Sequence, residues 1–115
     1  MPCIQIKTNV KTGEQTADQI RKGLGKAISW FPGKSEDWLL VSIEDDCQMY
    51  FGGTGGRPIA MMEVKILGDH IDKDGAKHMT EDATVLLGEA LGVAPNDMYI
   101  KYEALPDWGW NGKNF

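Results

Sequence analysis

The sequence predicts one α/β domain over residues 1–115, in which two helices cover one face of a four-stranded sheet. Two segments with helical spacing of apolar residues alternate with strand-like segments, in the order strand, helix, strand, given twice. Each of these units spans roughly 55 residues, and such units pack their helices against a shared sheet. A chain of 115 residues is typical of a single domain.

The first unit opens with the alternating segment Pro2 to Lys7, which predicts a strand. Thr12 and Gln15 have the spacing of a capping box, so a helix is expected to begin nearby. Its apolar face is formed by Ala17, Ile20, Leu24, Ala27, Ile28 and Phe31. Pro32-Gly33 ends this helix. The continuous apolar run from Trp38 to Ile43 is then expected to form a strand buried on both faces.

The second unit begins with a strand predicted over Pro58 to Leu67. Asp72 or Asp74 is expected to cap the following helix, and Gly92 stands where a helix ends in a left-handed glycine. The apolar face of this helix is formed by Met79, Ala83, Leu86, Leu87, Ala90 and Leu91. Asp97 to Tyr102 is the matching second strand.

Two helices on one face of a sheet leave its other face uncovered. Apolar residues on that face would need a partner, and oligomerisation is the usual way to cover them. Association of identical chains is expected to be symmetric. The glycine-rich connector Phe51 to Gly56 joins the two units, and an aromatic, turn-rich tail follows from Trp108 to Asn111.

Composition excludes several classes of protein. A net charge of −5 argues against a nucleic-acid binder, which needs a basic face. No apolar run reaches the roughly 20 residues of a membrane helix, and no signal peptide opens the chain, so a cytoplasmic location is expected. Cys3 and Cys47 are too few and too far apart for a disulfide framework. His70 and His78 lack neighbours at ligand spacing, so neither a metal nor another cofactor is expected.

Pro2 is the residue that points most directly to chemistry. If Met1 is removed, Pro2 becomes an N-terminal secondary amine, and free α-amines titrate at about 7.7–8.0. Burial or a nearby cation lowers that pKa towards neutrality, which suits proton transfer at carbon next to a carbonyl. Taken alone, Pro2 is also simply a common small second residue.

Several short motifs along the chain help to interpret Pro2. They are Met1-Pro2-Cys3-Ile4, Gly33-Lys34, Met49-Tyr50-Phe51-Gly52-Gly53, Leu67-Gly68, Tyr99-Ile100, Gly109-Trp110-Asn111 and the terminal Phe115. In their order and spacing they resemble the macrophage migration inhibitory factor family of the tautomerase superfamily. The resemblance implies two pseudo-symmetric βαβ units forming a four-stranded mixed sheet with two helices on one face. It also implies a homotrimer with active sites between subunits.

For function, the resemblance implies keto–enol tautomerisation of phenylpyruvate-type α-keto acids, with Pro2 as the catalytic base. Lys34 would bind the substrate carboxylate, although a solvated loop lysine is the plain alternative. Leu67 would offer its backbone N–H to the substrate. Tyr99 would come from the adjacent subunit, or be an ordinary half-buried strand tyrosine. The apolar wall of the pocket would be formed by Trp38, Trp108, Trp110 and Phe115.

The chain also departs from the family pattern. Lys101 stands where mammalian members carry an asparagine, and this second cation could hold a larger or dianionic acid at the site. Ile59 and Met62 replace the two cysteines of a CxxC motif, so thiol–disulfide exchange is not expected. No arginine near Gly13 matches the one implicated in receptor binding. A secreted, cytokine-like receptor-binding protein with vestigial catalysis, released by an unconventional route, is the competing hypothesis; a trimer without present chemistry is a third.

Overall fold

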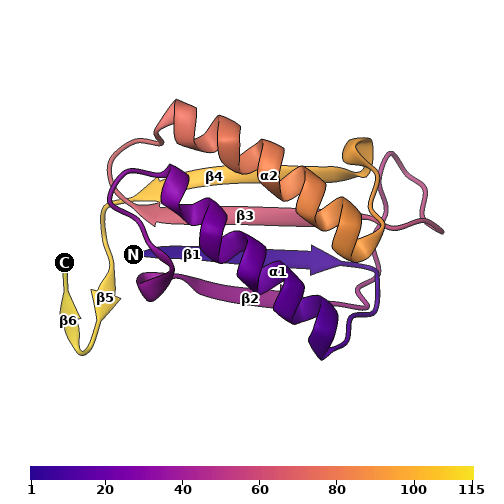
Figure 1. The fold of residues 1–115 in the computed structure, drawn as a ribbon, viewed down its shortest axis with the longest axis horizontal. Helices are drawn as coiled ribbons and strands as arrows, with labels where there is room; N and C mark the ends of the chain where they lie inside the picture. The colour runs from indigo at the N-terminus through magenta and orange to yellow at the C-terminus, as the bar shows by residue number, and fades with distance from the viewer.

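A computed structural model describes residues 1–115 and contains a four-stranded sheet with two helices on one face (Figure 1). The elements are β1 (Pro2–Thr8), α1 (Glu14–Ala27), β2 (Leu40–Glu44), β3 (Ala60–Leu67), α2 (Lys73–Leu91) and β4 (Met98–Leu105). The strands lie in the order β2-β1-β3-β4. β1 is parallel to β2 and antiparallel to β3, and β3 is parallel to β4. The predicted fold class is therefore confirmed, with a mixed sheet.

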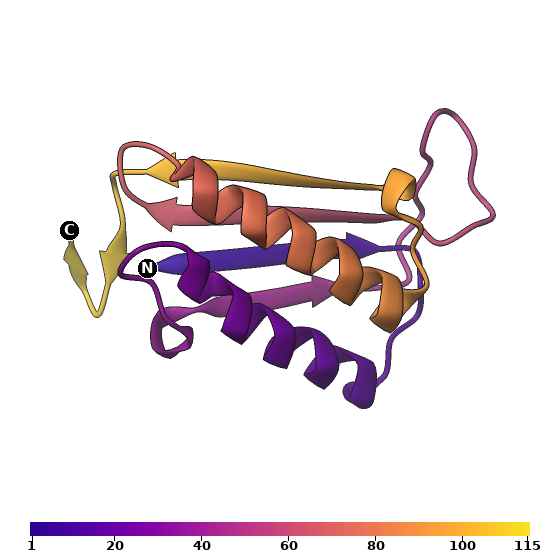
Figure 2. The same ribbon diagram turned by 45° about the horizontal axis from the view of Figure 1, so that its top comes forward.

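The core lies between the sheet and the two helices, which cross the same face side by side (Figure 2). Every second residue of the central strands β1 and β3 points into this layer. The largest fully buried side chains include Ile4, Ile6, Met62, Ile20, Leu24, Met79 and Leu87. Burying one such side chain stabilises the fold by about 1.5–3 kcal/mol. None of the helices is both long enough and apolar enough to pass through a lipid bilayer.

β2 is the element that differs most from its prediction. The strand starts at Leu40, and its residues alternate between exposed and half-buried. Trp38 lies before it in a short 3₁₀ turn, Glu36–Trp38. The prediction of a strand buried on both faces was wrong, because β2 is the edge strand and the helices leave one of its faces open.

The ends of the two helices depend on different kinds of contact. The N-cap of α1 is Gly13, without a side-chain cap, so the predicted capping box at Thr12 was wrong. Thr12 instead donates from its backbone N and its Oγ1 to Asp45 Oδ2, at 2.7 and 3.0 Å. α2 follows its prediction, since Asp72 Oδ2 accepts a hydrogen bond of 2.8 Å from the Gly75 amide, and Gly92 ends the helix with φ 72°.

The open face of the sheet carries charged side chains across its middle. Lys65 and Lys101 each lie 3.5 Å from a carboxylate oxygen of Glu63, and Lys65 Nζ donates to Gln5 Oε1 at 3.3 Å. Exposed apolar side chains occur only towards the ends of this face, with Leu40 at one end and Tyr99 at the other. The expectation of an apolar face in need of cover was therefore wrong for its middle.

Candidate active site

The start of β1 lies buried inside the sheet. Pro2 is opposite Ile66 of β3, and the Leu67 amide donates a hydrogen bond of 3.0 Å to the Met1 carbonyl. A proline is tolerated at the first position of a strand because its missing N–H is not needed there. While Met1 is attached, the Pro2 nitrogen is an amide and has no basic lone pair. Removal of Met1 would free both the Pro2 nitrogen and the Leu67 N–H.

Lys34 reaches the same end of the sheet. It follows Gly33, whose φ of 75° turns the chain, and its amide donates to the Phe31 carbonyl at 3.0 Å. Phe31 is 1 % exposed, so the loop is anchored in the core. The Lys34 Nζ then donates to the Leu67 carbonyl at 3.1 Å. The Lys34 ammonium therefore binds Leu67, the residue that directly follows Ile66, which is the β3 partner of Pro2.

The electrostatics of this end favour an uncharged amine. Burial, and then the positive charge of Lys34, lower the pKa of the Met1 amino group below its ordinary value. Both causes disfavour a second cation in a partly desolvated place. Pro2 is more buried than Met1, so a Pro2 amine would be subject to both effects.

An exposed aromatic cluster is formed by Trp38, Trp110 and Phe115 at this end. The Trp38 and Trp110 rings meet edge to face, with centroids 5.0 Å apart, and Trp110 stacks on Phe115 at 6.2 Å. These side chains remain 52 %, 49 % and 57 % exposed. They form an exposed aromatic surface, and its role as the wall of a substrate pocket stays a prediction.

Trp108 has a different role from the other aromatic residues. Its indole N–H donates to the Leu105 carbonyl at 2.7 Å, and its own carbonyl accepts from the Phe115 amide at 2.8 Å. These bonds hold the hairpin of β5 (Gly109–Trp110) and β6 (Lys113–Asn114) at the end of β4. The hairpin lies beside the N-terminus (Figure 1). Trp108 therefore anchors the segment that carries Trp110 and Phe115.

Two predicted site residues lie away from Pro2 within one chain. Tyr99 is opposite Met61, five residues along β3 from Ile66, which corresponds to about 17 Å. Its ring packs on Phe51, with centroids 4.9 Å apart. Lys101 is opposite Glu63, about 10 Å from Ile66 along β3, and pairs with that carboxylate. Neither joins the Pro2 site of its own chain.

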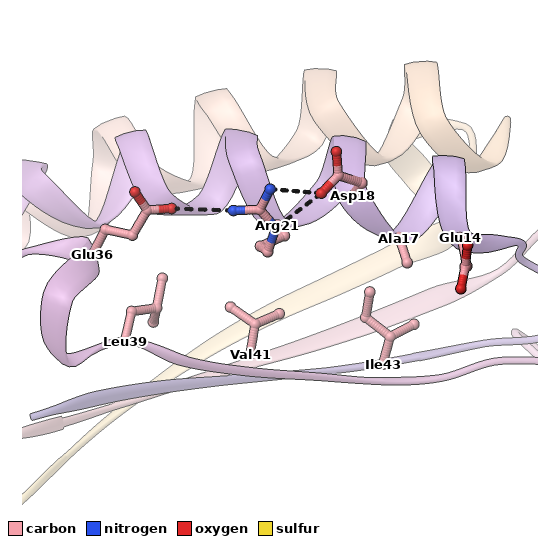
Figure 3. Close-up of a pocket in the computed structure, with 8 residues that line it drawn as sticks. All are labelled: Glu14, Ala17, Asp18, Arg21, Glu36, Leu39, Val41 and Ile43. Atoms are coloured by element: carbon pink, nitrogen blue, oxygen red, sulfur yellow. Dashed lines mark hydrogen bonds and ion pairs between the residues drawn. The ribbon is translucent and has the colours of Figure 1, made fainter.

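A hollow of about 620 Å³ lies elsewhere, between α1 and β2 (Figure 3). Apolar side chains of β2 and the segment before it form its floor. Arg21 crosses its rim, 2.6 Å from Asp18 and 3.8 Å from Glu36. The eight lining residues are Glu14, Ala17, Asp18, Arg21, Glu36, Leu39, Val41 and Ile43. None was predicted as a site residue, and the groove exists because α1 covers the edge strand only in part.

The comparisons with known proteins agree with this architecture. The sequence model of the macrophage migration inhibitory factor (MIF) family matches residues 1–115. A macrophage migration inhibitory factor homolog of Trichuris trichiura is 30% identical over 119 residues, covering 100% of both chains. Among solved structures, Leishmania major MIF2 superposes with a TM-score of 0.89 at 25% identity, covering 100% of this chain and 97% of its own.

A second similar structure is the macrophage migration inhibitory factor of Trichinella spiralis, with a TM-score of 0.80 at 26% identity over 98% of this chain and 99% of its own. The homologue from Prochlorococcus marinus gives 0.82 at 25% identity, with 98% of each chain covered. Because sequence and fold both match over essentially the whole length, the chain belongs to the macrophage migration inhibitory factor family, which is part of the tautomerase superfamily.

Proposed function

We propose that the chain is a keto–enol tautomerase of phenylpyruvate-type α-keto acids, with Pro2 as the catalytic base after removal of Met1. The observation that carries this proposal is the position of Lys34, whose Nζ lies 3.1 Å from the Leu67 carbonyl beside the start of β1. A buried amine next to an ammonium is a base with a lowered pKa, and the same ammonium attracts a carboxylate.

The chemistry follows from these groups. The neutral Pro2 amine would take a proton from the carbon next to the substrate's keto group, and the electron pair left behind forms the enol double bond. Returning the proton to oxygen gives the enol, so the reaction is an isomerisation. Lys34 would hold the carboxylate by a charge-assisted hydrogen bond. The Leu67 N–H, which donates to the Met1 carbonyl in the intact chain, would become free to bind the substrate.

The aromatic residues account for the proposed substrate class. An aromatic ring binds best against other rings in offset or edge-to-face contact. Trp38, Trp110 and Phe115 offer such a surface, and about half of each side chain is exposed. Trp108 supports this surface through its bond to Leu105.

We propose a homotrimer with its active sites between subunits. The support lies in Tyr99, which is 66 % exposed and too far along the sheet to reach Pro2 of its own chain. A second subunit could bring Tyr99 to that site. Lys101 would serve there only by leaving its pair with Glu63, so we expect its effect on substrate choice to be smaller than that of Lys34.

Receptor binding is the second candidate, favoured by the match to the macrophage migration inhibitory factor family over residues 1–115. For that role the chain would have to leave the cytoplasm, where we expect it, by an unconventional route. A receptor-binding assay with variants changed away from the Pro2 site would support this role if binding is lost while tautomerase activity is kept.

The test of the proposed enzyme starts with the intact mass, which should be lower by one methionine. The loss of enol absorbance of phenylpyruvate is then compared among the native chain, Pro2→Gly, and a chain with leucine inserted between Met1 and Pro2. In the inserted chain the Pro2 nitrogen stays an amide. We expect both altered chains to be slower by at least about 10²-fold, the usual contribution of a general base. Equal rates in all three chains would exclude Pro2 as the base.

A further inference from the structure

Arg57 joins the glycine-rich connector to the turn that precedes β4. Its Nη1 donates to Thr54 Oγ1 at 2.8 Å and to the Thr54 carbonyl at 3.3 Å. Its Nη2 donates to the Phe51 carbonyl at 3.2 Å, and its Nε lies 3.0 Å from Asp97 Oδ1. The Arg57 and Asp97 side chains are 35 % and 15 % exposed, so this ion pair is partly shielded from solvent, mainly on the Asp97 side.

The segments that Arg57 joins carry two aromatic residues that pack on each other, Phe51 and Tyr99. Phe51 begins the connector, and Asp97 is two residues before Tyr99. The Phe51 and Tyr99 rings pack with centroids 4.9 Å apart and planes inclined by 50°. Around them lies an apolar hollow of about 200 Å³, lined by Met49, Tyr50, Phe51, Gly52, Ile59, Ala60, Met61 and Tyr99.

Besides these Arg57 contacts, Asn9 holds the chain just after the connector, where its Nδ2 donates to the Arg57 carbonyl at 2.7 Å and its Oδ1 accepts from the Ile59 amide at 2.8 Å. Gly52, Gly53 and Gly56 have φ values of 62°, 83° and 82°, a region that glycine adopts without strain and that gives the chain freedom when unfolded. Pairing within the connector is limited to the bridge between Phe51 and Thr54 and a bond of 3.3 Å from Thr54 Oγ1 to the Phe51 carbonyl. The planar guanidinium meets several acceptors at fixed angles, which a lysine ammonium on a flexible stem does not reproduce.

We propose that Arg57 is a positioning residue for the active site of the neighbouring subunit, where it holds the Phe51–Tyr99 pair of its own chain against substrate bound at the neighbour's Pro2. This inference rests on the proposed function, because Tyr99 acts only if another subunit brings it to a Pro2 site. Arg57 touches neither the base nor the carboxylate group, so its loss should weaken substrate binding and leave the proton transfer unchanged.

The first test compares Arg57→Gln and Arg57→Lys with the native chain in phenylpyruvate tautomerisation. We expect KM to rise about 3- to 10-fold in Arg57→Gln, which corresponds to the loss of one ordinary interaction, with kcat within about twofold. Arg57→Lys keeps the positive charge but loses the planar, forked guanidinium, so its KM should lie between those of the native chain and Arg57→Gln. Arg21→Gln is the matched control, because it removes an ion-paired arginine on α1 and should leave KM unchanged.

A mixed assembly separates positioning from general destabilisation. When Arg57→Gln and Pro2→Gly chains are refolded together, some sites combine Pro2 of the first chain with Phe51 and Tyr99 of the second. These sites are intact, so a kinetic component with the native KM should return. If KM is unchanged in Arg57→Gln, or if mixing restores nothing, the inference is overturned.

Two controls separate the positioning role from misfolding and from failure of the proposed function. Should Arg57→Gln fail to fold, Asp97→Asn removes the same ion pair and serves in both experiments with the same expectations. If the native chain without Met1 has no tautomerase activity, the proposed function itself fails, and the kinetics of the Arg57 variants are not at issue. Native activity with a normal KM in both Arg57→Gln and Asp97→Asn overturns the positioning role alone.

Discussion

The Lys34 ammonium donates a hydrogen bond of 3.1 Å to the main-chain carbonyl of Leu67. The amide of the same Leu67 donates to the Met1 carbonyl at 3.0 Å. One residue at the end of β3 therefore contacts both the proposed cation and the start of the chain. Removal of Met1 leaves Lys34 next to a new amine and an unoccupied N–H donor.

Replacing Lys34 by glutamine should reduce kcat/KM for phenylpyruvate by about 10- to 100-fold, mainly through KM. The reason is that a hydrogen bond to a charged group contributes about 1.5–3 kcal/mol. Lys34→Arg keeps the charge and should lose less. Lys77→Gln, an exposed lysine on α2, is the control and should behave as the native chain. An unchanged KM in Lys34→Gln would remove the carboxylate role.

The pH dependence of kcat/KM should report the Pro2 amine. Burial and the charge of Lys34 lower the pKa of the Met1 amino group, and the same two causes would act on a Pro2 amine. Activity should therefore rise with pH and level off above an apparent pKa that lies below the ordinary 7.7–8.0. In Lys34→Gln the nearby cation is gone, and the apparent pKa should move up. Initial rates measured from pH 5 to pH 9 decide this, and an identical profile in both chains would contradict it.

Tyr102 should make stability depend on pH in the alkaline range. Its hydroxyl donates to the Ala76 carbonyl at 3.0 Å and lies 2.6 Å from Thr80 Oγ1. Burial raises the pKa of Tyr102 above its usual value, and the bond with Thr80 opposes this only in part. The folded chain thus keeps the proton longer than the unfolded chain, so this stabilisation is complete below about pH 10 and is lost as pH rises through the folded-state pKa.

The measurement is urea unfolding of the native chain and Tyr102→Phe between pH 7 and pH 11. At pH 7 the variant should be less stable by about 0.5–1.5 kcal/mol, the net contribution of a hydrogen bond. The difference should shrink above pH 10. Tyr50→Phe, at a side chain 64 % exposed, should show neither effect. A difference that stays constant to pH 11 would argue against the raised pKa.

Two glycines of α2 should respond in opposite ways to alanine. A Cβ at Gly75 would lie 2.9 Å from the Trp30 carbonyl and 3.0 Å from Phe31 Cδ1, so Gly75→Ala should destabilise the fold by about 1–3 kcal/mol. A Cβ at Gly88 would meet nothing closer than 3.5 Å, so Gly88→Ala should stabilise it by about 0.5–1 kcal/mol through helix propensity. Thermal unfolding of both variants gives the answer. If both substitutions stabilised the fold equally, Trp30 and Phe31, which precede Lys34, would have to move aside at little cost in free energy.

Local patterns were sufficient where a residue's partner is close in sequence. Of the two residues predicted to cap α2, Asp72 and Asp74, Asp72 does so by accepting from the Gly75 amide, and Gly92 ends the helix as predicted. The capping box predicted at Thr12 was wrong because the Thr12 hydroxyl binds Asp45, just after β2, a contact that spacing along the chain does not reveal. The prediction from the apolar run Trp38 to Ile43 was wrong because burial on both faces depends on where a strand lies in the sheet, and β2 lies at its edge.

The same distinction applies to the candidate site. Lys34 could be placed from sequence because it follows a helix end and precedes a strand, and the structure brings it to the start of β1. For Lys101 the sequence showed a second cation but not its partner Glu63, which comes from the neighbouring strand. Nothing in the sequence indicated the contacts of Arg57, because it binds backbone carbonyls of the connector and a carboxylate, Asp97, far along the chain.

The two chain ends lie at the same end of the sheet, with the β5–β6 hairpin beside the N-terminus (Figure 1). This has a practical consequence for making the protein. A purification tag fused before Pro2 would block its nitrogen, and one fused after Phe115 would extend from the aromatic cluster next to Trp110. The protein should therefore be produced untagged, or with a leader that a protease removes to leave proline as the first residue.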